Sequence, residues 1–142
     1  MATPTTVSPL LLRHVSLFAM LPEHQLAALA GAVSRRSIPR STTIIANGEV
    51  TDSLYVVISG RLKVTLSDDG GREVILSMLG DGEYFGDMEL IDDSTRSASV
   101  VSVERCELMV LSKHDFRQCL AENAEMSMAV MRSLVRRLRD AN

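Results

Sequence analysis

The chain has 142 residues, of which 46% are hydrophobic and 23% are charged, and its formal net charge at pH 7 is −3. This composition is typical of one folded domain with a substantial core, and it excludes both a disordered chain and a broadly basic surface for nucleic acid. No apolar run approaches the roughly 18 residues of a membrane helix, and the N-terminus lacks a signal-peptide pattern, so we expect a cytoplasmic protein without a membrane partner.

The N-terminal part of the chain is expected to be helical. Residues 1–9 are rich in Thr, Pro and Ser, which predicts a flexible segment. Residues 10–13 and 22–34 have helical patterns, and the second begins with Pro22, a residue favoured at the first position of a helix. We therefore assign residues 10–36 to N-terminal helices that cap a sheet.

Residues 37–112 have the pattern of an antiparallel β-domain. Leu62, Val64 and Leu66 alternate with polar residues, which predicts a strand with one buried face and one exposed face. Gly and Asn in tight turns separate this strand from similar short runs. The predicted strands cover residues 42–46, 54–59, 62–67, 73–79, 97–103 and 107–111. Many short strands with close turns predict an α+β fold, mainly β, built as a jelly-roll β-barrel, also called a double-stranded β-helix.

Residues 113–142 are expected to form two C-terminal helices. Ser112 begins a capping-box sequence, which predicts a helix ending near residue 122. The following helix, from residue 124 to the end, carries an apolar stripe of Met126, Val130, Met131, Leu134, Val135 and Leu138. This stripe can pack on the barrel or pair with a second copy of the chain. A basic group near its end, Arg136, Arg137 and Arg139, could form a nucleic-acid patch but is interpreted as solvated charges that complement the helix dipole.

The segment 82–100, GEYFGDMELIDDSTRSASV, combines residues suited to an anion that also carries a hydroxyl group. Gly86 lets a ligand approach the backbone, and the next residues predict a short helix whose free N–H groups face an anion. Arg96 offers a donor fork that matches phosphate oxygens, and the serines after it offer neutral donors. Asp87 is repelled by a phosphate unless it accepts from a sugar hydroxyl. The segment therefore indicates a nucleotide site; the alternative is that Arg96 is a surface residue paired with Asp87, Asp92 or Asp93.

Several stretches of this sequence resemble a known family. Phe85-Gly86-Asp87-Met88, Leu90-Ile91 and Arg96-Ser97-Ala98-Ser99-Val100 resemble the phosphate-binding cassette of cyclic nucleotide-binding domains. The likeness is greatest to the catabolite activator protein (CRP/FNR) family of bacterial transcription regulators. It extends to Leu17-Phe18 with Leu21, to residues 52–60 and to residues 72–76, and so covers nearly the whole chain.

The resemblance implies that residues 10–142 form a ligand-sensing domain for a cyclic nucleotide, above all cAMP. In this interpretation Gly86 and Asp87 hold the phosphate end and the ribose 2′-hydroxyl, while Arg96 and Ser97 bind the cyclic phosphate. Ser99 supports the pocket. Phe85, Met88 and Ala98 complete the expected site, and no prosthetic group is implied.

The resemblance also implies a homodimer that forms through the long C-terminal helix. The expected dimer residues are Val130, Met131, Leu134, Val135 and Leu138. Ligand binding between the barrel and this helix is expected to bias the position of the helix, which is how such sensors transmit a signal.

Two positions depart from the family pattern. Members that bind cAMP usually carry Glu where this chain has Asp87, which is shorter by one methylene. An alignment through Arg136 and Arg137 places Ala141 and Asn142 where the family has a Thr-Ser pair on the purine, which leaves Asn142 as the expected base contact. These departures keep open a degenerate, ligand-free dimerisation module. Arg96 argues against that alternative, because a buried arginine without an anion is costly.

A third class of function is an enzyme on the same kind of barrel, such as a metal-dependent cupin, which needs His and carboxylate ligands inside the barrel. His14, His24 and His114 all fall on expected helices or caps. Cys106 and Cys119 lack C-x-x-C spacing and are interpreted as buried free thiols. We therefore expect no metal site and no catalysis.

Regulators of this family carry a helix–turn–helix domain after the long helix, and no such domain is present in these 142 residues. We therefore expect the chain to be the sensor part of a longer regulator that contacts DNA only through that further domain. The oxygen-sensing branch of the family carries additional N-terminal cysteines for an iron–sulfur cluster. Because no cysteine precedes Cys106, that branch is excluded.

Overall fold

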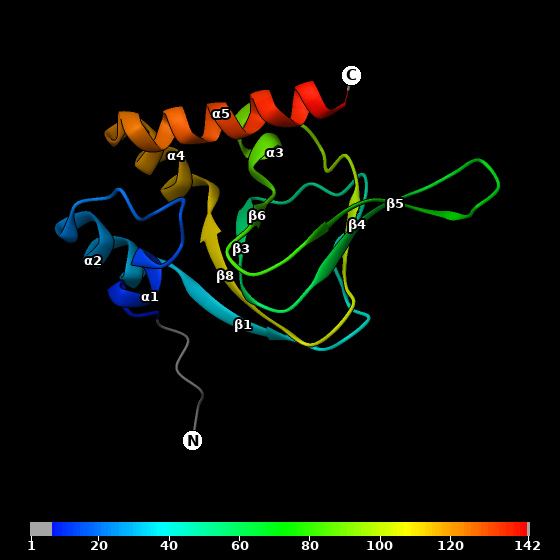
Figure 1. Cartoon of the computed structure of the whole chain (residues 1–142), viewed down its shortest axis with the longest axis horizontal. Helices are drawn as coiled ribbons and strands as arrows, with labels where there is room; N and C mark the ends of the chain where they lie inside the picture. The colour runs from blue at the N-terminus through cyan, green and yellow to red at the C-terminus, as the bar shows by residue number, and fades with distance from the viewer. Residues whose placement is uncertain (1–6, 142) are drawn as a thin grey trace.

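The computed structural model describes residues 7–141, which form a β-roll flanked by helices (Figure 1). The strands are β1 (Ser34–Ile38), β2 (Thr43–Ile45), β3 (Ser53–Ser59), β4 (Leu62–Ser67), β5 (Glu73–Leu79), β6 (Tyr84–Phe85), β7 (Ser99–Ser102) and β8 (Cys106–Ser112). The helices are α1 (Pro9–Arg13), α2 (Glu23–Ala32), α3 (Asp87–Asp92), α4 (Lys113–Glu122) and α5 (Ala124–Asp140).

The strands form two antiparallel four-stranded sheets, in the orders β1-β8-β3-β6 and β2-β7-β4-β5. This arrangement confirms the predicted jelly roll. Figure 1 shows α1 and α2 at one end of the roll, with α5 lying across it and the β4–β5 hairpin projecting at the opposite end. The short helix α3 lies between α5 and the roll (Figure 1). In the chain it connects β6 to β7, so these two strands position its ends.

Two strands were missed by the sequence prediction. Residues 34–36 of β1 were assigned to the N-terminal helices and residues 37–38 to the β-domain without a strand, and β1 includes the exposed Arg35 and Arg36. It forms because it pairs with β8 along its whole length, from Ser34 opposite Val110 to Ile38 opposite Cys106. β6 has only two residues and exists through its pairing with β3. Long-range pairing therefore overrode a weak local pattern in both places.

The alternation predicted for β4 is interrupted. Leu62 and Thr65 are buried, whereas Val64 and Leu66 are only half-buried. The pairing with β5 shifts between Val64 and Thr65, which marks a bulge. A bulge turns the side chains that follow it and increases the local twist, so the period of two does not continue through it.

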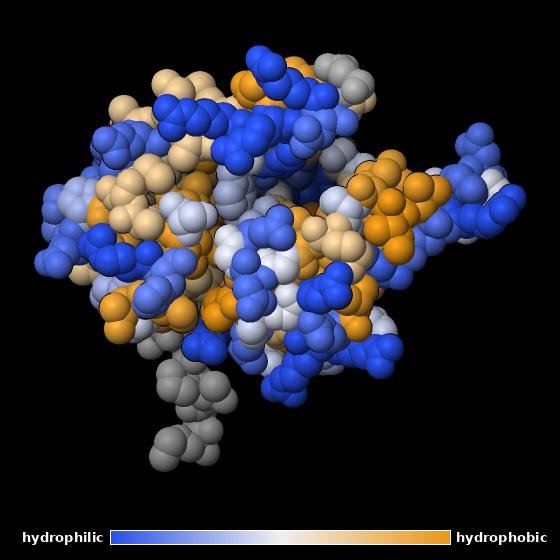
Figure 2. Space-filling model, in the orientation of Figure 1, coloured by the Kyte–Doolittle hydropathy of each residue, from blue (hydrophilic) through white to orange (hydrophobic). Residues whose placement is uncertain are grey.

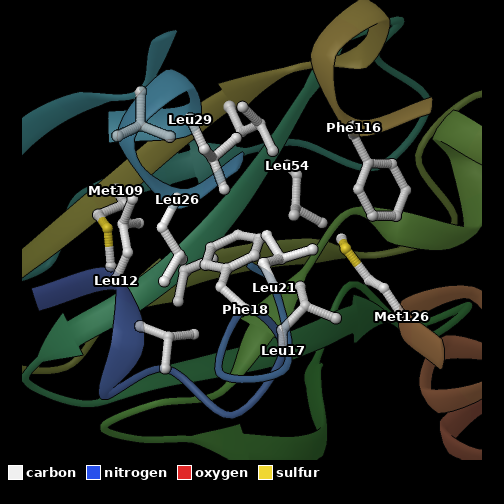
Figure 3. Close-up of a cluster of buried hydrophobic side chains, with 14 of the residues drawn as sticks. Leu12, Leu17, Phe18, Leu21, Leu26, Leu29, Leu54, Met109, Phe116 and Met126 are labelled. Atoms are coloured by element: carbon white, nitrogen blue, oxygen red, sulfur yellow. The ribbon is translucent and has the colours of Figure 1, made fainter. Parts of the chain in front are cut away.

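The main core lies between the N-terminal helices and the first sheet. Leu12, Phe18 and Leu26 meet Leu54 of β3, and Figure 3 shows these side chains together with Phe116 of α4 and Met126 of α5. These contacts attach the C-terminal helices to the sheet. The predicted flexible segment 1–9 is only partly tested, since residues 1–6 lie outside the described residues. Val7 is buried in this core and Ser8 caps α1, so residues 7–9 are held.

The C-terminal helices follow the prediction closely. The hydroxyl oxygen of Ser112 accepts from the backbone N–H of Asp115 at 3.2 Å and caps α4. The apolar stripe of α5 divides into two groups. Met126 and Val130 are buried and Leu134 is partly buried against the domain's own core, whereas three residues are exposed, namely Met131 (49%), Val135 (48%) and Leu138 (67%).

Candidate functional site

A cavity of about 950 Å³ lies between the second sheet, α3 and α5. Its volume falls within the range of about 300–1,000 Å³ that is usual for small-molecule sites. Figure 2 shows the surface hollowed below the C-terminal helix. Its lining includes residues 85–88, Ser97 and Ala98 from the predicted site, together with Glu89, apolar residues of the strands (Ile45, Val64, Leu66, Leu76, Met78, Val100), and Ala129, Ser133, Arg136 and Arg137 of α5.

Gly86 is the residue that allows α3 to begin beside a buried arginine. It has φ +91° at the N-cap of α3, a conformation that favours glycine. A Cβ at this position would lie 2.5 Å from Arg96 Nη1 and 3.1 Å from the backbone oxygen of Ser53. The preceding Phe85 is buried and stacks on Tyr55 of the neighbouring strand, with ring centroids 5.1 Å apart. Together these contacts fix the path of the chain into α3.

Arg96 is completely buried and every nitrogen of its guanidinium group donates. Nη1 donates to the backbone oxygen of Gly86 at 2.9 Å and to Glu89 Oε1 at 2.9 Å, while Nη2 donates to the backbone oxygen of Ser53 at 2.7 Å. Nε donates to the hydroxyl oxygen of Thr51. Arg96 is 1% exposed and Glu89 is 8% exposed, so this ion pair is shielded from water.

The contact with Glu89 corrects two expectations from the sequence. The partner of Arg96 is not one of the aspartates that were considered, and the arginine does not lack an anion within the protein. The cost of an unpaired buried arginine therefore gives no argument against a ligand-free module. Sequence reasoning missed Glu89, although its position two residues after Asp87 in a short helix already placed it near the predicted phosphate site.

Asp87 forms a second ion pair that joins α3 to α5. Its Oδ2 lies 2.8 Å from Arg137 Nη2, and the Asp87 side chain is 1% exposed while that of Arg137 is 43% exposed. Burial by itself lowers the pKa of Arg137, but the hydrogen bond and charge of Asp87 outweigh it, so the pKa of Arg137 is raised. The arginine was interpreted as a solvated charge. Its spacing of seven residues from the buried Val130 was the available signal that it faces inward.

Of the other predicted site residues, some line the cavity and some do not. Met88, Ser97 and Ala98 line the cavity. The hydroxyl oxygen of Ser99 instead accepts from the backbone N–H of Asn47 at 2.9 Å and so holds the adjoining turn. Asn142, the expected base contact, lies outside the described residues.

The C-terminal end of α3 is tied to α4. Arg117 Nε donates to the backbone oxygen of Leu90 at 2.8 Å, and both Lys113 and Arg117 pair with Asp93. Hydrogen bonds from Lys113 and then from Arg117 lower the pKa of Asp93. The short helix at the cavity is therefore connected to α4 at one end and to α5 at the other.

The described part of the chain, residues 7–141, contains no cluster of three or more His, Cys, Asp or Glu side chains that could hold a metal ion. Within the same residues no helix is both long and apolar enough to cross a bilayer. Cys106 is a buried free thiol as predicted, whereas Cys119 is half-buried.

The fold defines a jelly-roll domain with a nucleotide-sized cavity, and the carboxylates of two ion pairs, Asp87 and Glu89, lie in the wall of that cavity. Residues 35–123 match the family model described as a cyclic nucleotide-binding domain. The chain therefore belongs to the cyclic nucleotide-binding domain family, as its resemblance implied. Membership of this family identifies a binding domain and not an enzyme.

Known proteins with similar sequences and folds include transcription regulators. The chain is 30% identical over 132 residues to a CRP-like cAMP-activated global transcriptional regulator of Mycobacterium tuberculosis, covering 93% of this chain and 59% of the relative. It resembles the crystal structure of the Thermus thermophilus catabolite activator protein, with 34% identity and a TM-score of 0.78, over 94% of this chain and 60% of that one. The chain thus spans about three fifths of the length of these regulators.

A further similar structure comes from a protein kinase. The regulatory domain of Toxoplasma gondii PKA, solved with cAMP, is 33% identical with a TM-score of 0.70, over 78% of this chain and 42% of that one.

Proposed function

We propose that this chain is a sensor domain that binds a cyclic nucleotide, with cAMP as the effector, in the cavity below α5. The observation that carries the proposal is that Asp87 and Ser97 line one cavity that α5 also lines, with the buried Arg96 bonded to Gly86 and Glu89 of its wall. These groups combine an acceptor for a sugar hydroxyl with donors for a phosphate. The M. tuberculosis relative is described as cAMP-activated, and the T. gondii domain was solved with cAMP, which supports this choice of ligand.

In the proposed complex Asp87 accepts from the ribose 2′-hydroxyl, and Ser97 and Arg96 contact the cyclic phosphate. Ser97 is exposed to the cavity, so its hydroxyl can reach a ligand without a change in the backbone. Phe85, Gly86, Met88 and Ala98 form the surrounding wall, and Asn142 remains the proposed contact to the base.

We propose that the signal passes through Asp87. This carboxylate is bonded to Arg137 of α5, with Asp87 Oδ2 2.8 Å from Arg137 Nη2. A ribose hydroxyl that donates to Asp87 enters this ion pair and changes how firmly α5 is held over the cavity. The contacts of Arg117 with the carbonyl groups of α3 offer a second route, from the same helix to α4.

We propose that α5 also forms a homodimer. Its outward residues Met131, Val135 and Leu138 are spaced by four and three residues, which is the spacing of a coiled-coil seam. Of the other residues assigned to the dimer, Val130 is buried in the domain's own core and Leu134 packs partly against it. The proposed seam is therefore narrower than the full stripe.

We further propose that the domain serves a cytoplasmic CRP/FNR-type transcription regulator, in which DNA is contacted by another domain. The M. tuberculosis and T. thermophilus proteins, which are longer than this chain, support this proposal.

A second candidate function is a ligand-free dimerisation module. The observation that favours it is that Arg96 and Arg137 each have a carboxylate partner within the protein, so neither arginine requires a ligand. The two candidates differ in whether any cyclic nucleotide binds.

Isothermal titration with cAMP, cGMP and cyclic di-GMP at fixed salt tests the proposal. We expect saturable binding of cAMP, weakened about fivefold to tenfold in Ser97→Ala because one neutral hydrogen bond contributes about 1 kcal/mol. Arg132→Ala on the same helix serves as the control, and it should bind like the unaltered protein because Arg132 does not line the cavity. An absence of heat and of any thermal shift with all three nucleotides supports the ligand-free module instead.

A further inference from the structure

We propose that Glu89 is an internal anion that competes with the ligand's phosphate for Arg96 and so sets which phosphates the cavity accepts. This inference rests on the proposed function, because it concerns the same cavity. It begins from the ion pair between Glu89 Oε1 and Arg96 Nη1, whose atoms lie 2.9 Å apart and are almost completely buried.

Glu89 supplies the only negative charge that pairs with Arg96 among residues 7–141. The other acceptors of the guanidinium are the hydroxyl of Thr51 and the backbone oxygens of Gly86 and Ser53, which orient the group without neutralising it. An entering phosphate therefore finds the arginine already oriented, with its charge already balanced by a carboxylate.

Glu89 lines the cavity, whereas Arg96, which is bonded to it, does not, so a phosphate that approaches Arg96 comes close to the Glu89 carboxylate. Two negative charges a few ångströms apart repel one another strongly where water is excluded. The ligand must therefore displace the carboxylate from Arg96 or share the arginine with it. In either case the ligand's phosphate binds more weakly than it would to an arginine that has no carboxylate partner.

The repulsion depends on the charge of the ligand, and this makes Glu89 a determinant of specificity. A cyclic phosphodiester carries one negative charge, whereas a phosphomonoester carries about 1.5 to 2 at pH 7. Glu89 therefore disfavours a nucleoside monophosphate more than it disfavours the cyclic ester. Asp87 is paired with Arg137, so the charges of these four residues balance, and Arg136 is the other arginine among residues 7–141 that lines the cavity.

Titration of Glu89→Gln with cAMP and with adenosine 5′-monophosphate tests this role. Glutamine has the size of glutamate and can still accept from Arg96, so the arginine stays oriented while the charge is removed. We expect cAMP to bind about tenfold more tightly and the monophosphate to gain by a larger factor. Glu83→Gln is the matched control, because Glu83 lines the same cavity but bonds to the backbone of Gly80 and not to Arg96.

Equal or weaker binding of cAMP by Glu89→Gln overturns the inference, since it makes Glu89 a support for Arg96 and not a competitor. An equal gain for both nucleotides overturns the role in specificity. If the variant does not fold, ¹³C NMR of the glutamate carboxylates in the unaltered protein decides. On addition of cAMP the Glu89 resonance should shift more than that of Glu83, and an unchanged Glu89 resonance contradicts displacement.

Inorganic phosphate separates this inference from the proposed function. If neither the unaltered protein nor Glu89→Gln binds a nucleotide, the proposed function fails. Glu89→Gln should then still bind inorganic phosphate more tightly than the unaltered protein, because its arginine is no longer neutralised. Equal binding of phosphate by the two proteins overturns the inference as well.

Discussion

Substitution of Gly86 by alanine tests how closely α3 and Arg96 are packed. Gly86 has φ +91°, so alanine there costs about 1–2 kcal/mol in backbone strain alone. Its Cβ would also lie 2.5 Å from Arg96 Nη1, at the point where the arginine meets Glu89. Arg96 is fixed by its other bonds and cannot retreat without weakening the buried ion pair. Breaking such a pair costs about 3–5 kcal/mol, and we take the lower value of about 3 because the bonds to Thr51 and Ser53 can survive.

Gly82→Ala provides the matched control for this experiment. Gly82 has φ +84°, nearly the same backbone strain, but a Cβ there has no atom within 4 Å. We expect scanning calorimetry to place the midpoint of Gly86→Ala about 10 °C below that of Gly82→Ala, from about 3 kcal/mol at roughly 3–4 °C per kcal/mol. Gly86→Ala should also weaken cAMP binding. Equal midpoints for the two variants would refute the reasoning, because they would show that Arg96 yields at no cost.

Three further predictions concern the ion pairs and the outer face of α5. Arg137→Ala leaves a buried carboxylate without its cation and should lower the free energy of unfolding by about 1–2 kcal/mol in urea titrations, discounted because the arginine is 43% exposed. Arg132→Ala should change it by less than about 0.5 kcal/mol, and equal losses would contradict the role of the pair. The pKa of Asp93 is lowered from 3.8 by the cations of α4, so its stabilising contribution is present above that pH and is lost as the pH falls through the folded-state pKa. The difference in unfolding free energy between the unaltered protein and Asp93→Asn should therefore narrow in acid, and a difference independent of pH argues against the contact. Val135→Glu should raise the dimer dissociation constant at least about tenfold in sedimentation equilibrium, whereas Val50→Glu, which alters a residue 83% exposed and outside α5, should leave it unchanged.

The sequence predicted those features that rest on local patterns. The turns and apolar runs gave β4 and β5 with their observed bounds, because a hairpin depends on residues close in the chain. The capping sequence at Ser112 predicted α4 for the same reason. The cassette from Phe85 to Ser99 was recognisable because its glycine, carboxylate and arginine lie within one short segment.

Other features depended on the partners that folding brings together. β1 could not be predicted from its own residues, since its stability comes from β8, which lies about seventy residues further along the chain. The division of the α5 stripe likewise followed from which side of the helix meets the core, a property of packing and not of periodicity.

The sequence alone thus determined the kind of site, because the residue types that suit a phosphate and a sugar hydroxyl all lie within residues 82–100. Only the tertiary structure decided which charged side chains of that site pair with one another. The partner of Asp87 comes from α5, fifty residues away, and the fold also directs Glu89 of the cassette itself toward Arg96. Spacing in the chain does not specify such pairs, because the strength of an ion pair depends on distance and burial, and both are set by the fold.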